Sequence, residues 1–85
     1  MAEQEIGVIQ HYFDKITVAI INVTQGELAV GDTIHIKGHT TDVTTKIESM
    51  QFDHKVIEKA LPGESTGVKV PSKVRIQDKV FKVTP

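Results

Sequence analysis

Cysteine and tryptophan are absent from this 85-residue sequence, and proline and the other aromatic residues are few. Without cysteine the chain can form neither disulfides nor thiolate metal sites, so it suits a reducing compartment and we expect a cytoplasmic protein. The acidic residues 1–5 lack the basic region and the apolar segment of a signal peptide. The longest apolar runs are too short to span a bilayer, so we also expect no membrane association.

The proportion of apolar residues is that of an ordinary folded domain. Hydrophobic residues make up 39% of the chain and charged residues 25%, which is typical of globular rather than disordered proteins. At this length a chain buries only roughly 60–65% of the surface that its unfolded form exposes, so the core must be economical. We expect a single monomeric domain over residues 1–85, with residues 1–4 disordered.

Short β-branched runs with alternating apolar residues dominate the sequence and predict an all-β fold. The expected strands are residues 5–13, 16–24, 33–37, 43–52, 65–70, 74–76 and 79–83. Within 43–52 the apolar positions change parity, which predicts a β-bulge or bend near Glu48-Ser49. Residues 53–61 suit one helical turn as well as a short strand. Six to seven short strands indicate a small closed antiparallel β-barrel.

Residues 26–36 nearly match a phosphate-binding loop and then depart from it. That motif needs Gly, four residues, Gly, then Lys and Ser or Thr, but Asp32 occupies the lysine position and would repel a phosphate. The residues that follow alternate with the period of a strand rather than that of a helix. We therefore interpret Gly31-Asp32 as a hairpin turn and Pro62-Gly63 as a second turn, because these residue types favour turns.

Several short motifs along most of the chain have the order and spacing of a known domain. They are Gly7-Val8, Gly26, Val30-Gly31-Asp32 before Ile34 and Ile36, Gly38, Ile47-Glu48-Ser49-Met50, and Ala60-Leu61-Pro62-Gly63-Glu64 ahead of Gly67-Val68-Lys69-Val70. With these residues the chain resembles the second domain of translational GTPases such as elongation factor Tu. The resemblance implies the translation-protein barrel and a role in protein biosynthesis. No complete phosphate loop or guanine-reading motif is present, so no GTPase domain is expected.

The chain also departs from that family. At its last turn Gln77-Asp78 stands where the family usually has Gly before Asp. Similar barrels occur at the C-terminus of collagenase-like peptidases and as free-standing translation-factor-like proteins. Residues 11–15 and 37–42 resemble this branch more closely, so we weight it highest.

Basic residues are concentrated late in the chain, where residues 55–85 carry seven bases against three acids. Outward-facing bases can contact phosphates, and an aromatic ring can stack on a nucleobase. The candidate nucleic-acid-binding residues are Lys69, Lys73, Arg75 and Lys82, with His35, Lys37, His39 and Tyr12. By analogy with the resembled domain, we expect a non-catalytic translation-factor-like module that binds RNA, either tRNA or the ribosome, or a translation-related or tRNA-related protein. The alternative is a protein-interaction module that serves a collagenase-like peptidase.

Neither a metal site nor a catalytic centre is expected from the sequence. His35 and His39 have the spacing of helical zinc ligands, but on a strand this spacing does not bring two rings together. His11 and His54 are isolated, and the serines lie in no recognised nucleophile context. We therefore expect no enzyme activity and no cofactor.

Overall fold

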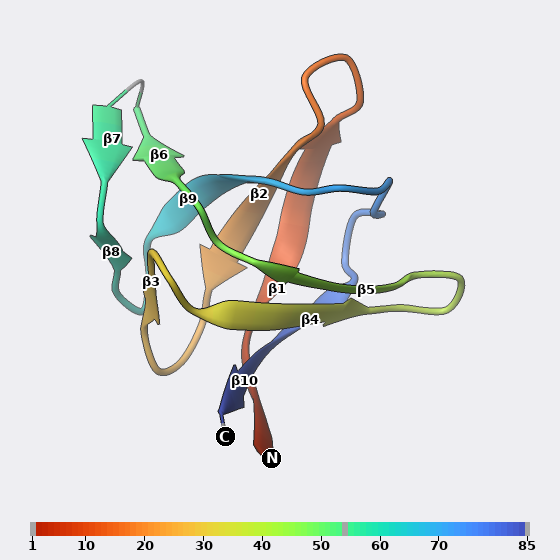
Figure 1. Cartoon of the computed structure of the whole chain (residues 1–85), viewed down its shortest axis with the longest axis horizontal. Coiled ribbons are helices and arrows are strands. Elements are labelled where there is room, and N and C mark those ends of the chain that lie inside the picture. The colour runs from red at the N-terminus through yellow and green to blue at the C-terminus, as the bar shows by residue number, and fades with distance from the viewer. Residues whose placement is uncertain (1, 54, 85) are drawn as a thin grey trace.

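Ten β-strands and no helix form the secondary structure of residues 2–53 and 55–84, the part of the chain that a computed structural model describes (Figure 1). The strands are β1 (Ala2–Phe13), β2 (Val18–Val23), β3 (Leu28–Ala29), β4 (Thr33–Lys37), β5 (Asp42–Lys46), β6 (Met50–Phe52), β7 (Lys55–Ile57), β8 (Lys59–Ala60), β9 (Ser65–Lys69) and β10 (Lys79–Thr84). The predicted all-β class is confirmed. Among the described residues, none lies in a helix with the length and apolar character needed to cross a membrane.

Eight strands form one antiparallel sheet in the order β5-β4-β10-β1-β2-β9-β6-β7, while β3 pairs with β8 in a separate two-stranded sheet. The large sheet is strongly curved, with β10 and β1 adjacent near its middle (Figure 1). β5 and β7 form its two ends, and no ladder joins these strands within the described part of the chain. The antiparallel all-β sheet is therefore observed, whereas closure into a barrel is not confirmed.

The core is aliphatic and takes its side chains from one face of each main strand. Its buried members are Ile6, Ile9, Ala19, Ile21, Val23, Leu28, Ile34, Ile36, Ile47, Met50, Ala60, Val68, Val70, Val74 and Val80. β2 and β4 contribute alternate residues, as the two-residue period of a strand predicts. β1 instead buries both Ile6 and Ile9, because its ladder with β10 shifts register between Glu5 and Gly7.

The bend predicted near Glu48-Ser49 is present. β5 pairs with β4, whereas β6 pairs with β7 and β9, so the chain changes partners across residues 47–49. Ile47 and Met50 on either side of the bend are both fully buried. The change of apolar parity in the sequence therefore marks the point where the chain leaves one end of the sheet and crosses to the other.

Two expected segments differ from the structure, and the structure decides a third that the sequence left open between a helical turn and a strand. Residues 2–4, which we expected to be disordered, belong to β1 and pair with β10, while Met1 lies outside the described residues. The run 74–76 is not a strand, and Ile76 is 59% exposed because it lies in a turn rather than on an inward face. Residues 53–61 contain the short strands β7 and β8 rather than a helical turn.

Three four-residue turns have the same pattern of hydrogen bonds, which was not recognised from the sequence. They span residues 29–32, 61–64 and 75–78. In each, the fourth residue donates its backbone N–H to the carbonyl of the first, at 3.1, 3.0 and 3.2 Å. The carboxylate of that fourth residue accepts the N–H of the first, at 2.9, 2.7 and 2.9 Å. The third residue has a positive φ, which is 97° at Gly31, 90° at Gly63 and 74° at Gln77, as in type II turns.

The Gly31-Asp32 turn does not close a hairpin, contrary to the prediction. The strands on either side of it do not pair with each other, because β3 pairs with β8 and β4 pairs with β10 and β5. Instead Gly31 donates its N–H to the carbonyl of Ile47 at 2.8 Å, and Ile47 donates to the carbonyl of Asp32 at 2.9 Å. The turn therefore holds the chain at the bend that follows β5. Pro62-Gly63 lies within the second of the three turns.

Candidate functional site

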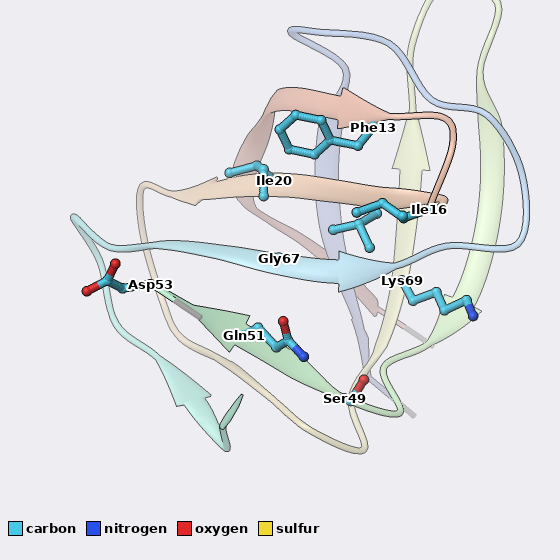
Figure 2. Close-up of a pocket in the computed structure, with 9 residues that line it drawn as sticks. Phe13, Ile16, Ile20, Ser49, Gln51, Asp53, Gly67 and Lys69 are labelled. Atoms are coloured by element: carbon cyan, nitrogen blue, oxygen red, sulfur yellow. The ribbon is translucent and has the colours of Figure 1, made fainter. Parts of the chain in front are cut away.

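A groove of about 390 Å³ lies over β2, β9 and β6 (Figure 2). The residues that line it are Phe13, Ile16, Val18, Ile20, Ser49, Gln51, Asp53, Gly67 and Lys69. Sites for small molecules and peptide side chains typically measure roughly 300–1,000 Å³ and combine an apolar lining with a few polar groups. We name this surface the β2–β9–β6 groove and treat it as the candidate functional site.

The two sides of the groove differ in polarity. On the side of β1 and β2 the lining is apolar, and Phe13 and Ile16 are 49% and 60% exposed. The opposite side is polar and is formed by Ser49, Gln51 and Asp53. Figure 2 shows Lys69 and Asp53 at opposite ends of the groove. A ligand in this groove would therefore meet apolar groups on one side, hydrogen-bonding groups on the other and a cation at one end.

Gly67 forms the floor of the groove on β9. A Cβ atom at this position would lie 3.3 Å from Val18 Cγ1, 3.4 Å from Ile20 Cδ1 and 3.5 Å from the carbonyl oxygen of Gln51. A side chain would therefore fill the space between β2 and β6. Because strand positions normally carry side chains that cover neighbouring strands, glycine here leaves a trough along β9.

The apolar side of the groove follows from the composition of β2. We expected residues 16–24 to form a strongly buried strand, because this segment is apolar on both faces. The structure buries Ala19, Ile21 and Val23 but leaves Val18 and Ile20 only half-buried on the outer face. No element of the described residues covers that face, so the second set of apolar residues lines the groove. The sequence signal for this site was β2, a strand with apolar residues on both faces in a chain of only 85 residues.

Three of the predicted nucleic-acid-binding residues lie together, at a different place. Tyr12, Lys73 and Arg75 line a broad hollow of about 560 Å³, together with His11, Asp14, Val74 and Ile76. Lys73 and Arg75 are exposed, whereas Tyr12 is half-buried and packs against the core. Lys69 does not belong to this hollow and borders the β2–β9–β6 groove instead.

The other predicted residues do not join that hollow, and two of them already have carboxylate partners. Lys82 Nζ lies 3.2 Å from Asp32 Oδ2, so its charge is paired within the fold. His35 contacts two carboxylates, whereas Lys37 and His39 are exposed at the end of β4 and in the following loop. One hollow therefore contains three of the eight candidates, and the other five lie outside it.

His35 links three strands of the sheet through its imidazole ring. Its Nδ1 lies 3.1 Å from both carboxylate oxygens of Glu3 on β1, and its Nε2 contacts Asp42 Oδ1 on β5. The hydrogen bond with Asp42 and then that with Glu3 raise the pKa of His35 above its usual value, because both favour the protonated ring. The His35 side chain is only 15% exposed, while those of Glu3 and Asp42 are 45% and 75% exposed, so solvent weakens these contacts.

The raised pKa of His35 predicts a pH-dependent contribution to stability. Since the pKa is higher in the folded state, the contribution is complete below the unfolded pKa of about 6.5 and is lost as pH rises through the folded pKa. We expect the His35→Gln variant to lose roughly 0.5 kcal/mol more unfolding free energy relative to wild type at pH 5.5 than at pH 9. Urea unfolding at both pH values measures this difference. His39→Gln, in an exposed loop, is the control, and an equal pH dependence in both variants would contradict the assignment.

The described residues contain no group of three or more His, Asp or Glu that could hold a metal ion. Both ring nitrogens of His35 are engaged by carboxylates, and His54 lies outside the described residues. Ser65 Oγ donates to Gln10 Oε1 at 3.0 Å, and this amide cannot act as a general base. The geometry of these residues therefore provides no activated nucleophile of the kind that hydrolysis requires.

Comparison with known proteins relates the chain to proteases. It is 38% identical over 72 residues to a collagenase of Porphyromonas gingivalis and 42% identical over 78 residues to an uncharacterised protease of Methanocaldococcus jannaschii. The chain is homologous to one segment of these collagenase-like proteases. The alignments cover 84% and 91% of the chain, which spans only about a fifth of the length of these relatives, 20% and 19%. No protein-family model matches the chain.

A solved structure places this collagenase-like segment in a known fold. The C-terminal domain of a candidate U32 peptidase from Geobacillus thermoleovorans superimposes on the chain with a TM-score of 0.87, over 95% of this chain and 93% of that domain. The sequence identity of 17% limits this likeness to the fold. The resemblance to the collagenase-like C-terminal barrel is thus supported, whereas the resemblance to translational GTPases is not.

Proposed function

We propose that this chain is a non-catalytic accessory module that acts with a collagenase-like peptidase. The observation that carries the proposal is the extent of the match: nearly the whole chain aligns with proteases, yet it accounts for only about a fifth of each. A segment of this kind is one module of a larger working unit. The fold of a U32 peptidase C-terminal domain, seen at a TM-score of 0.87, supports the same role.

Among the described residues no hydrogen bond joins a serine or threonine hydroxyl to a histidine or a carboxylate, which supports a module without a reaction of its own. The exposed apolar residues of the β2–β9–β6 groove support a binding role, because small soluble domains seldom leave such groups together on the surface without a partner.

We also propose that the curved sheet is a small barrel. The β3–β8 pair and the bond from the Val30 N–H to the carbonyl of Glu58 support this, because β3 leads into β4 and β8 follows β7, near the two ends of the large sheet.

RNA binding, our first expectation, has no support from the protease relatives, and the protein-interaction alternative fits them better. The hollow that contains Tyr12, Lys73 and Arg75 is the place where an RNA contact would occur. Variants at Lys73 and Arg75 therefore separate the two functions.

Binding to a purified collagenase-like peptidase from the same organism tests the proposed function. We expect size-exclusion chromatography to show a stoichiometric complex that persists after nuclease treatment. A Lys73→Glu, Arg75→Glu double variant should bind the peptidase as wild type does, because the proposal assigns these bases no role in the contact. A complex that nuclease dissolves, or the absence of any complex with the peptidase, would overturn the proposal.

A further inference from the structure

The β2–β9–β6 groove has the lining that an extended peptide requires. The side chains of an extended segment alternate between two faces, so one set can lie on an apolar wall while the backbone faces polar groups. Here Ile16, Val18 and Ile20 supply the apolar wall, and Ser49 with Gln51 supplies the polar wall. Within the described residues, neither Ser49 nor the Gln51 side chain makes a hydrogen bond that a ligand would have to displace.

Adjoining hollows lengthen the groove along β9 in both directions. Toward the start of β9, a hollow of about 150 Å³ continues past Ile20 to Phe52, which is 45% exposed. Toward its end, a hollow of about 300 Å³ contains Lys46, Glu48, Ser49 and Lys69. The shared residues Ile20, Gly67, Ser49 and Lys69 make these three hollows one continuous surface. This continuity along a strand matches an extended chain better than a compact molecule.

The end of the groove at Lys69 is suited to a carboxylate. Lys46 and Lys69 both line this end, and within the described part of the chain neither lies within 4.0 Å of a carboxylate oxygen. Glu48 shares the hollow but forms no ion pair with either lysine. The two ammonium groups therefore leave an excess of positive charge at this end, while Asp53 occupies the other. Because a phosphate chain would meet apolar side chains and then Asp53, the charges favour a peptide over a nucleic acid.

We propose that the β2–β9–β6 groove binds an extended peptide segment that places apolar side chains against Ile16, Val18 and Ile20 and a carboxylate at Lys69. The carboxylate is that of a Glu or Asp side chain within the segment. This site goes beyond the proposed function, since it specifies the chemistry of the bound segment whichever protein supplies it. Gly67 is the residue on which the depth of the groove depends.

Titration of the ¹⁵N-labelled chain with synthetic peptides tests the site. The probes are Ac-Val-Thr-Val-Thr-Val-Glu-NH2, the same peptide with Gln in place of Glu, and Ac-Val-Thr-Val-Thr-Val with a free C-terminus. We expect saturable shifts of the Ile20, Gly67 and Lys69 amides, with Glu→Gln weakening binding about threefold to fivefold, the range of an exposed ion pair. The free-acid peptide should bind more weakly than the Glu peptide, and tighter binding of the free acid would overturn the assignment to a side-chain carboxylate.

Variants of the protein distinguish the groove from other binding sites. Lys69→Gln should reduce the difference between the Glu and Gln peptides and a Lys46→Gln, Lys69→Gln double variant should abolish it, whereas Lys73→Gln, in the other hollow, should leave it unchanged. Gly67→Val should weaken both peptides at least tenfold by filling the trough. Ile16→Asp should weaken both peptides to a similar extent. It alters an exposed turn residue, so it tests the groove even if Gly67→Val disturbs folding. Shifts confined to the hollow around Arg75, no saturable shift at millimolar peptide, or stronger groove shifts with a uridine octamer would overturn the proposal.

Discussion

Replacing Gly7 with alanine should destabilise the fold by roughly 3 kcal/mol, because the new methyl group has no space between two paired strands. Gly7 is buried in β1 and pairs with Val80 of β10 and Val23 of β2. Its Cβ would overlap the carbonyl oxygen of Asn22 and lie 3.2 Å from the Cα of Val23. These are backbone atoms, so the change cannot be accommodated by a side-chain rotation. The two strands would have to move apart in the middle of the sheet.

Thermal unfolding followed by circular dichroism measures this effect. For a domain of this size, 3 kcal/mol corresponds to a decrease in Tm of roughly 12–24 °C. Gly67→Ala is the matched control, since it also adds one methyl group to a strand. There the nearest atoms include the flexible ends of Val18 and Ile20 at 3.3 and 3.4 Å, so we expect a loss below about 1 kcal/mol. Similar losses in the two variants would contradict this prediction, because the cost would then not depend on the close contact between Gly7 and the backbone of β2.

Replacing Asp78 with alanine should cost about 2 kcal/mol, the second largest effect that we expect. Asp78 is only 7% exposed, and its Oδ2 accepts the N–H of Arg75 at 2.9 Å. The turn also joins β1, because Gln77 donates to the carbonyl of Ile9 at 2.7 Å and Ile9 donates to the carbonyl of Asp78 at 2.8 Å. Gln77 adopts a φ of 74°, which costs a residue other than glycine about 1 kcal/mol. The carboxylate therefore holds a strained turn against the central strand.

Glu64→Ala provides the comparison, because the same hydrogen bond occurs in an exposed turn. There the N–H of Leu61 can bind water when the carboxylate is lost, so we expect a cost below about 1 kcal/mol. Urea unfolding of both variants measures the difference. Equal costs in the two variants would show that the hydrogen bond itself, and not the burial of Asp78, determines the contribution of the turn.

The sequence predicted the strands well where alternation was unbroken and less well where the backbone departs from it. β4, β9 and β10 were recognised from β-branched residues with a two-residue period, and β2 from a β-branched run that is apolar on both faces. The burial of both Ile6 and Ile9 could not be predicted, since a bulge reverses the parity of β1 and depends on pairing with β10. The assignment of Gly31-Asp32 to a hairpin was wrong for a different reason. A turn motif indicates a reversal but does not identify which strands pair.

The candidate site was predicted less well than the fold. Of its residues, only Lys69 was selected from the sequence, and for contact with phosphate rather than with a carboxylate. Charge clusters in a sequence do not reveal ion pairs between distant strands, so Lys82 and His35 were counted as free although both contact carboxylates. The groove depends on which outer face is left uncovered, and this is a property of the sheet order rather than of any local pattern.

The adjacency of β1 and β10 has a consequence for how the chain folds. These strands come from opposite ends of the sequence and pair near the middle of the sheet, with Ala2 opposite Thr84. Without residues 79–84, β4 and β5 would be separated from the strands β1, β2, β9, β6 and β7. The central ladder can therefore form only after nearly all of this segment has been synthesised, and such long-range pairing places folding in the slow range of small domains, roughly milliseconds to seconds. Until those last residues leave the ribosome, the unpaired backbone groups at the edges of β1 and β4 remain available to other chains.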